Sequence, residues 1–136
     1  MRALLDINIV LDVLLKRIPW QAEADAILQA SRDGKLSCVV ASHSIATVFY
    51  IARRQVGTDQ ARTAVRECLQ VFEIATVDRS VWEAADALPG ADFEDNIQIA
   101  AAVRDGADAI VTRDPRGFAA CPIDVLSPVD LAGRLI

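Results

Sequence analysis

The sequence predicts an α/β fold of three layers, in which a mostly parallel sheet of four to five strands lies between helices on both faces. Short apolar runs rich in Val, Leu and Ile recur along the chain and are typical of buried strands. Segments with apolar residues three and four positions apart separate these runs and are typical of helices packed on a sheet. Strands that alternate with helices favour parallel pairing.

The first half of the chain alternates one expected strand with two expected helices. Pro19 suits the first turn of the second helix, and Gly34 ends that helix. Ser42 or Ser44 is positioned to cap the helix after the second strand. The expected strands are 2–5 and 36–41, and the expected helices are 7–15, 19–32, 45–54 and 58–69.

The second half repeats this pattern and ends with two strands close in sequence. Asp78 or Ser80 can cap a short helix that runs through Leu88, where Pro89-Gly90 breaks it. The expected strands are 71–77, 109–112 and 123–126, and the further helices are 91–105 and 128–135. The element order is therefore βαα-βαα-βαα-β-βα, within one domain that spans residues 1–136.

Composition restricts the class of protein. The net charge of −5 argues against a non-specific nucleic-acid binder, which usually has a basic face. No stretch approaches the roughly 18 apolar residues of a membrane span, and Asp6 interrupts the first apolar run too early for a signal peptide. Cys38, Cys68 and Cys121 lack C-x-x-C spacing and are expected to be buried free thiols. We expect a cytoplasmic protein that does not contact a membrane.

Acidic residues follow the ends of expected strands. Asp6 comes directly after the first strand, and Asp114 closely follows the fourth. Asp92, Glu94 and Asp95 begin the long helix at 91–105. In an open parallel sheet, residues beyond the carboxyl ends of the strands converge on one crevice, which is where such folds bind ligands.

Each acid also has a purely structural interpretation. Asp6 and Asp92 can cap helices, Asp95 can favour a positive helix end, and Asp114-Pro115 is an ordinary turn. Several carboxylates from distant segments that meet at one edge repel each other, and a cation offsets that repulsion. The sequence therefore favours a cation site at this edge.

Three segments together resemble the PIN-domain family. They are LLDINIVLD at 4–12, DFEDNIQIAAA at 92–102 and IVTRD at 110–114, with Gly117-Phe118 just after. The family's first segment typically has Thr-Asn after the aspartate, and its last typically reads Val-Thr-Arg-Asp with Phe a few residues on. The resemblance covers nearly the whole chain.

PIN domains of this size are mostly metal-dependent ribonucleases, and many are the toxins of toxin–antitoxin pairs. The resemblance implies that Asp6, Asp95 and Asp114 are catalytic acids that bind Mg²⁺ or Mn²⁺, which prefer oxygen ligands. It also implies an RNA substrate, an antitoxin protein as partner and a homodimer. The candidates for phosphate contacts are Arg53, Arg54, Arg113 and Arg116, although each suits a solvated surface at least as well.

Two positions depart from the family pattern. Ile7 replaces the usual Thr after the first aspartate. Thr47 stands at about the place where the family often has a Glu in the helix after the second strand. Glu94, beside Asp95, is the candidate for the missing metal ligand.

Two other functions remain open on the sequence alone. A PIN-like domain that has lost nuclease activity would serve as a binding module, and Thr47 is compatible with this. An aspartyl phosphotransferase or phosphatase would use Asp6 as the phosphorylated group, but Asn8 stands where those folds carry a second acid. A dinucleotide-binding role lacks the G-x-G-x-x-G turn.

Overall fold

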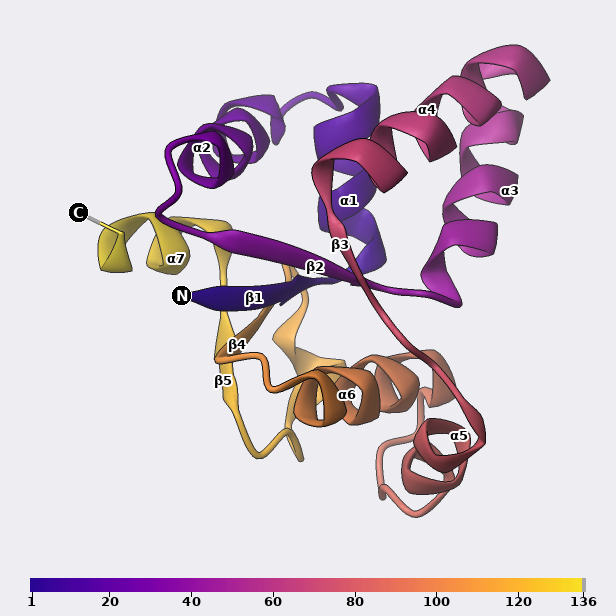
Figure 1. Cartoon of the computed structure of the whole chain (residues 1–136), viewed down its shortest axis with the longest axis vertical. Coiled ribbons are helices and arrows are strands. Elements are labelled where there is room, and N and C mark those ends of the chain that lie inside the picture. The colour runs from indigo at the N-terminus through magenta and orange to yellow at the C-terminus, as the bar shows by residue number, and fades with distance from the viewer. Residues whose placement is uncertain (136) are drawn as a thin grey trace.

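Five parallel strands form a sheet with the order β3-β2-β1-β4-β5 (Figure 1). The computed structural model describes residues 1–135. The strands are β1 (Arg2–Leu5), β2 (Ser37–Ala41), β3 (Glu73–Ala75), β4 (Ala109–Val111) and β5 (Asp124–Leu126). Strand β1 is central, and its Leu4 pairs with Val39 of β2 on one side and Ile110 of β4 on the other.

Residues 1–135 also form seven α-helices and one short 3-10 helix, and all but the last helix connect strands. They are α1 (Ile7–Leu15), α2 (Gln21–Arg32), α3 (Ser44–Val56), α4 (Thr58–Val71), α5 (Arg79–Asp86), α6 (Phe93–Asp105), η1 (Pro115–Phe118) and α7 (Pro128–Arg134). The chain runs outward from β1 through β2 to β3 and then crosses back to β4 on the other side of β1. The strand order therefore reverses between β1 and β4, which is where such sheets place their ligands.

Helices cover both faces of the sheet, with α5 and α6 on one face and most of the others on the opposite face (Figure 1). Side chains alternate along β1, because successive residues of a strand point to opposite faces. Ala3 and Leu5 pack with α1, α2 and α7, whereas Leu4 packs with α5 and α6. Both apolar layers consist mainly of aliphatic side chains, in line with an aromatic content of only 5%.

The predicted fold class and the order of elements are confirmed. Three local predictions are wrong. The strand expected at 71–77 is shorter, because α4 continues to Val71 and β3 covers only Glu73–Ala75. Helix α2 begins at Gln21, so Pro19 precedes its first turn. Neither serine caps α3: His43 occupies the cap position, the Ser42 hydroxyl accepts a hydrogen bond from the Val77 backbone N–H at 3.0 Å, and Ser44 is fully buried. Ser42 is used instead to join the ends of β2 and β3.

The cysteines match the prediction of free thiols. Cys38 and Cys68 are buried, and Cys121 is partly buried. Burial raises the pKa of Cys38 and of Cys68 to about 11, since the thiolate is disfavoured away from water. Among residues 1–135, no helix combines the length and the apolar character needed to cross a membrane.

Ion pairs of Arg2 join the amino end of β1 to β3 and to the end of α6. The Arg2 side chain donates to Asp105 at 2.7 and 3.0 Å and to Glu73 at 2.7 Å. The side chain is 31% exposed, so these partly screened contacts contribute modestly to stability.

Arg2→Gln should lower the free energy of unfolding by about 1 kcal/mol, measured by urea denaturation. Arg79→Gln removes a much more exposed pair, to Glu83 at 3.9 Å, and should change the stability little. Equal losses in both variants would contradict the prediction.

Candidate active site

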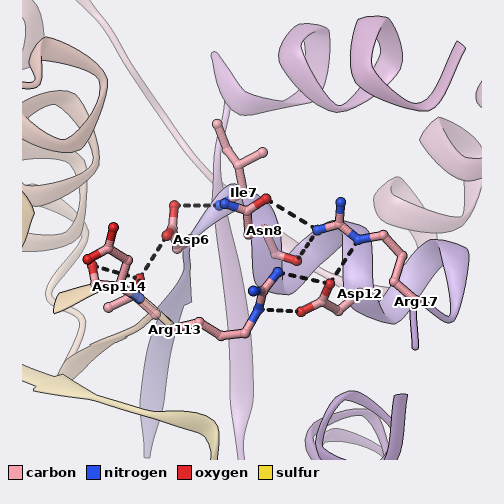
Figure 2. A network of polar contacts seen from close by, with 8 residues as sticks. Asp6, Ile7, Asn8, Asp12, Arg17, Arg113 and Asp114 are labelled. Carbon is pink, nitrogen blue, oxygen red and sulfur yellow. Dashed lines mark hydrogen bonds and ion pairs between the residues drawn. The ribbon is translucent and has the colours of Figure 1, made fainter. Parts of the chain in front are cut away.

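Asp6 is a buried carboxylate at the carboxyl end of the central strand. It is 8% exposed and caps α1 by accepting a hydrogen bond from the Ile7 backbone N–H at 2.8 Å (Figure 2). Gln98 of α6 donates to the same oxygen at 2.9 Å, and the Thr112 hydroxyl donates to the other oxygen at 2.8 Å. Neutral donors from three separate segments therefore fix both oxygens of this carboxylate and compensate its loss of water.

Asp95 is a carboxylate without a compensating charge. It lies in the first turn of α6, where its backbone N–H donates to Asp92 at 3.1 Å. Burial raises the pKa of Asp95 to about 6, and repulsion from Asp92, Asp6, Glu94 and Asp114 adds to the effect. Within residues 1–135, no arginine, lysine or histidine forms an ion pair with it.

Gly117 of η1 allows the Asp95 carboxylate to lie against the backbone of the segment that carries Asp114. A Cβ added at Gly117 would overlap an oxygen of this carboxylate and stand 2.7 Å from its carbon. Only a residue without a side chain leaves room for the carboxylate in this position. The presence of a glycine at position 117 thus has a steric reason.

Asp114 is exposed and holds an arginine. Arg116 donates to its two oxygens at 2.9 and 3.0 Å, and these hydrogen bonds lower the pKa of Asp114. The pair is exposed on both sides, with 58% of the Asp114 side chain and 88% of the Arg116 side chain accessible. Such solvated pairs are weak, so Asp114 can exchange this partner for another cation.

A cleft of about 560 Å³ lies over this group of residues. Asp92, Asp95, Asp114, Arg116 and Gly117 line it, together with residues 89–91, 119 and 120. Asp6 does not line the cleft, but its charge contributes to the raised pKa of Asp95, and Thr112 connects it to Asp114. The structure thus brings Asp95 and Asp114 together at one cleft and places Asp6 next to them in the interior.

The chemistry of these donors fits a hard divalent cation, with one rearrangement. In the described part of the chain, no three His, Cys, Asp or Glu side chains stand close enough to hold one ion together. The Asp114 side chain is turned toward Arg116, and it would have to leave that partner to join Asp95. A cation at Asp95 would offset both its burial and the repulsion from four neighbouring carboxylates.

Glu94 has a different partner from the one predicted for it. Its carboxylate lies 2.9 Å from Nε2 of His43, the residue that precedes α3, and it does not line the cleft with Asp95. Neighbouring positions on a helix point about 100° apart, so Glu94 and Asp95 face different groups. Thr47 is half-buried on α3 and does not line this cleft either.

Sequence reasoning missed two residues that hold Asp6. Gln98 is fully buried three positions after Asp95, and the residues that follow it on α6, 99–102, are buried and apolar. Thr112 is 2% exposed at the end of β4. A polar residue at a buried position of an apolar helix was the available signal, because buried amides need partners.

The raised pKa of Asp95 yields a prediction about stability. The folded protein binds a proton at Asp95 more tightly than the unfolded chain, whose aspartates titrate near 4. As pH rises from about 4 to about 6, the folded state therefore loses stability relative to the unfolded state. In metal-free buffer, Asp95→Asn should be more stable than the wild type at pH 8 by about 1 kcal/mol, a value reduced for partial exposure. Urea denaturation at pH 4 and pH 8 measures this, and an equal difference at both values would mean that ionisation is not the cause.

The chain is similar to known proteins both in sequence and in fold. The sequence profile of the PIN domain matches residues 2–116. No curated protein sequence matches the chain. Similar solved structures include FitAcB from Neisseria gonorrhoeae, with 16% identity and a TM-score of 0.70 over 93% of this chain and 98% of that one.

Two further solved structures have the same fold. VapC20 from Mycobacterium tuberculosis, described as a sarcin-ricin loop cleaving toxin, has 14% identity and a TM-score of 0.69 over 87% of this chain and 94% of that one. A toxin–antitoxin complex from Klebsiella pneumoniae gives 23% identity and 0.66 over 93% and 97%. At such identities the likeness concerns the fold, whereas the sequence profile covers most of the chain. The chain belongs to the PIN domain family.

Proposed function

We propose that the protein is a ribonuclease that depends on Mg²⁺ or Mn²⁺ and hydrolyses RNA phosphodiester bonds. The observation that carries the proposal is the Asp95 carboxylate. Its pKa is raised to about 6, it has no ion-pair partner in residues 1–135, and four acids repel it, of which Asp6 and Asp114 come from other segments. Membership of the PIN domain family supports the same activity.

Asp6, Asp95 and Asp114 would hold the metal, with Gln98 and Thr112 fixing the orientation of Asp6. A bound divalent ion in such a site polarises phosphate oxygens and lowers the pKa of a coordinated water, so no side chain has to act as a covalent nucleophile. Arg116, once released from Asp114, is placed at the rim of the cleft where it can contact a phosphate. The net negative charge of the chain does not exclude RNA, because the ion reverses the local sign.

We further propose a toxin role with an antitoxin protein as partner, in the cytoplasm. The Klebsiella pneumoniae structure of this fold is a toxin–antitoxin complex, and VapC20 is described as a toxin that cleaves the sarcin-ricin loop. A homodimer is part of the proposal, because three large apolar side chains are exposed: Trp20 before α2 (37%), Tyr50 on α3 (55%) and Leu69 on α4 (55%). Such exposed large side chains are often covered by another subunit.

The phosphotransferase alternative fits the site less well. Both oxygens of Asp6 already accept hydrogen bonds from buried donors, and Asp6 is 8% exposed, which leaves little access for an incoming phosphate. One observation favours the binding-module alternative. Within residues 1–135, Asp6, Asp95 and Asp114 are not close enough together to hold one metal ion without a rearrangement.

Cleavage of RNA in the presence of Mn²⁺ tests the proposed function. EDTA should abolish cleavage, and Asp114→Asn should lower its rate by about a hundredfold or more because a charged ligand is lost. Asp124→Asn is the matched control: Asp124 is also 58% exposed and paired with an arginine, Arg134 at 2.8 Å, but lies on β5 away from the cleft. Activity that survives EDTA, or equal loss in the two variants, would refute the proposal.

The roles of Glu94 and Thr47 lead to a second prediction for this site. Thr47→Glu should bind Mn²⁺ several-fold more tightly and cleave RNA faster, because it restores the acid that the family often has. Glu94→Gln should weaken both modestly, since Glu94 is held by His43 and adds charge from a distance. Calorimetric titration with Mn²⁺ measures the affinities. Unchanged affinity in Thr47→Glu with a large loss in Glu94→Gln would instead identify Glu94 as a direct ligand.

A further inference from the structure

Asp12 is the most completely buried carboxylate in the described residues, and it lies outside the cleft. It is 1% exposed in the middle of α1. Two arginines compensate its charge: Arg113 donates from Nε at 2.9 Å and from Nη2 at 3.3 Å, and Arg17 donates from Nε at 2.9 Å. Figure 2 shows Asp12 between these two arginines. A buried carboxylate with this many charged donors is an organised polar centre.

Arg113 is held on its other side by an aromatic ring. Its guanidinium carbon lies 3.6 Å from the centre of the Trp20 ring, which is a close cation–π contact. The Arg113 side chain is only 24% exposed, and its fork of donors is directed at Asp12. These contacts favour a structural role for Arg113 over the phosphate contact that the sequence suggests.

The position of Arg113 in the chain connects this cluster to the candidate active site. Arg113 stands between Thr112, whose hydroxyl holds Asp6, and Asp114, which lines the cleft. Two successive residues, Thr112 and Arg113, thus bind two aspartates six positions apart on and before α1. Arg17 returns to the same region, since its Nη2 donates to the backbone oxygen and side-chain oxygen of Asn8, both at 3.2 Å.

We propose that Asp12, Arg113 and Trp20 form a strut that positions Thr112 and Asp114, so that the strut sets the affinity of the site for divalent metal without touching metal or RNA. This inference rests on the proposed function for its metal readout. The physical reason is that a side chain with a fixed fork and a fixed stacking face leaves its backbone little freedom. The strut residues are positioning residues, not catalytic ones.

Mn²⁺ titration by calorimetry tests the strut in the full chain, at a temperature where each variant is folded. Arg113→Gln and Asp12→Asn should each weaken Mn²⁺ binding by about tenfold. Arg113→Lys keeps the charge but loses the fork, so it should also weaken binding. The double variant should lose no more than either single one, because both residues act in one strut.

Arg2→Gln is the matched control, because Arg2 also directs a forked pair of donors at an aspartate, but at the opposite end of β1. It should lose stability and keep its Mn²⁺ affinity. Hydrogen exchange of the segment 112–116, in metal-free buffer, should be faster in Arg113→Gln than in the wild type and unchanged in Arg2→Gln. The exchange measurement reports on positioning without any metal.

Three outcomes would overturn the strut. Unchanged Mn²⁺ affinity and unchanged exchange in Arg113→Gln, with only lower stability, would make the cluster purely structural. Unchanged Mn²⁺ affinity with weaker binding of a short fluorescent single-stranded RNA would make Arg113 a phosphate contact. Faster exchange with unchanged Mn²⁺ affinity in Arg113→Gln would show that the strut positions the segment but does not set the metal affinity.

Asp6→Asn separates failure of the strut from failure of the proposed function. If Asp6→Asn binds Mn²⁺ more weakly than the wild type and Arg113→Gln does not, the metal site is right and the strut is wrong. If Asp6→Asn binds Mn²⁺ as the wild type does, the proposed metal site is wrong, and the effect of the strut on metal falls with it. Faster exchange in Arg113→Gln would then support the positioning of segment 112–116 alone.

Discussion

Parallel pairing of β1 with β4 determines how the candidate active site is built. The backbone N–H of Asp6 donates to the Val111 carbonyl at 2.9 Å, which extends the ladder of these two strands by one residue. That last bond brings the Asp6 carboxylate to the Thr112 hydroxyl, and the chain beyond Thr112 then carries Asp114 to the cleft. A register shift of one residue would turn every side chain of a strand to the other face of the sheet. The apolar layers on both faces therefore fix the geometry of the acids as well as the core.

The three acids differ in how their charge is compensated, and this difference assigns them different roles. Asp6 is compensated by neutral donors and is rigid, whereas Asp114 is compensated by an exposed arginine and can change partner. Asp95 lacks such a partner among the described residues, and its pKa is raised by burial and by the other acids. A cation that enters the cleft would relieve repulsion at Asp95, replace Arg116 at Asp114 and meet an Asp6 that is already oriented. Asp6 is thus already oriented for a cation, whereas Asp114 has to exchange Arg116 for it.

Local patterns predicted the fold well because each element carries its own signal. The run at β1, the start of α4 after Gly57 and the cap by Asp78 all depend on neighbouring residues, and the structure has them where the sequence predicts them. The partners of the acids depend instead on contacts between distant segments, such as Gln98 with Asp6, 92 positions apart, and His43 with Glu94, 51 positions apart. Sequence spacing contains no information on which of several polar side chains will meet across the sheet. The convergence of acids was predictable from topology, and the compensation of each acid was not.

Asp12 illustrates why a buried ion pair is better understood as a determinant of geometry than of stability. Two charges removed from water gain little net free energy, and well-packed apolar residues of similar volume often stabilise a protein as much. A chain selected for stability alone would have no need for Asp12 and Arg113 between α1 and the 112–114 segment. A directional pair, however, fixes the distance and angle between these two segments, which apolar contacts leave looser. The two segments that it joins are the ones that carry Asp6 and Asp114. Burial of Asp12 costs free energy, but the ion pair fixes how these two aspartates are placed relative to each other.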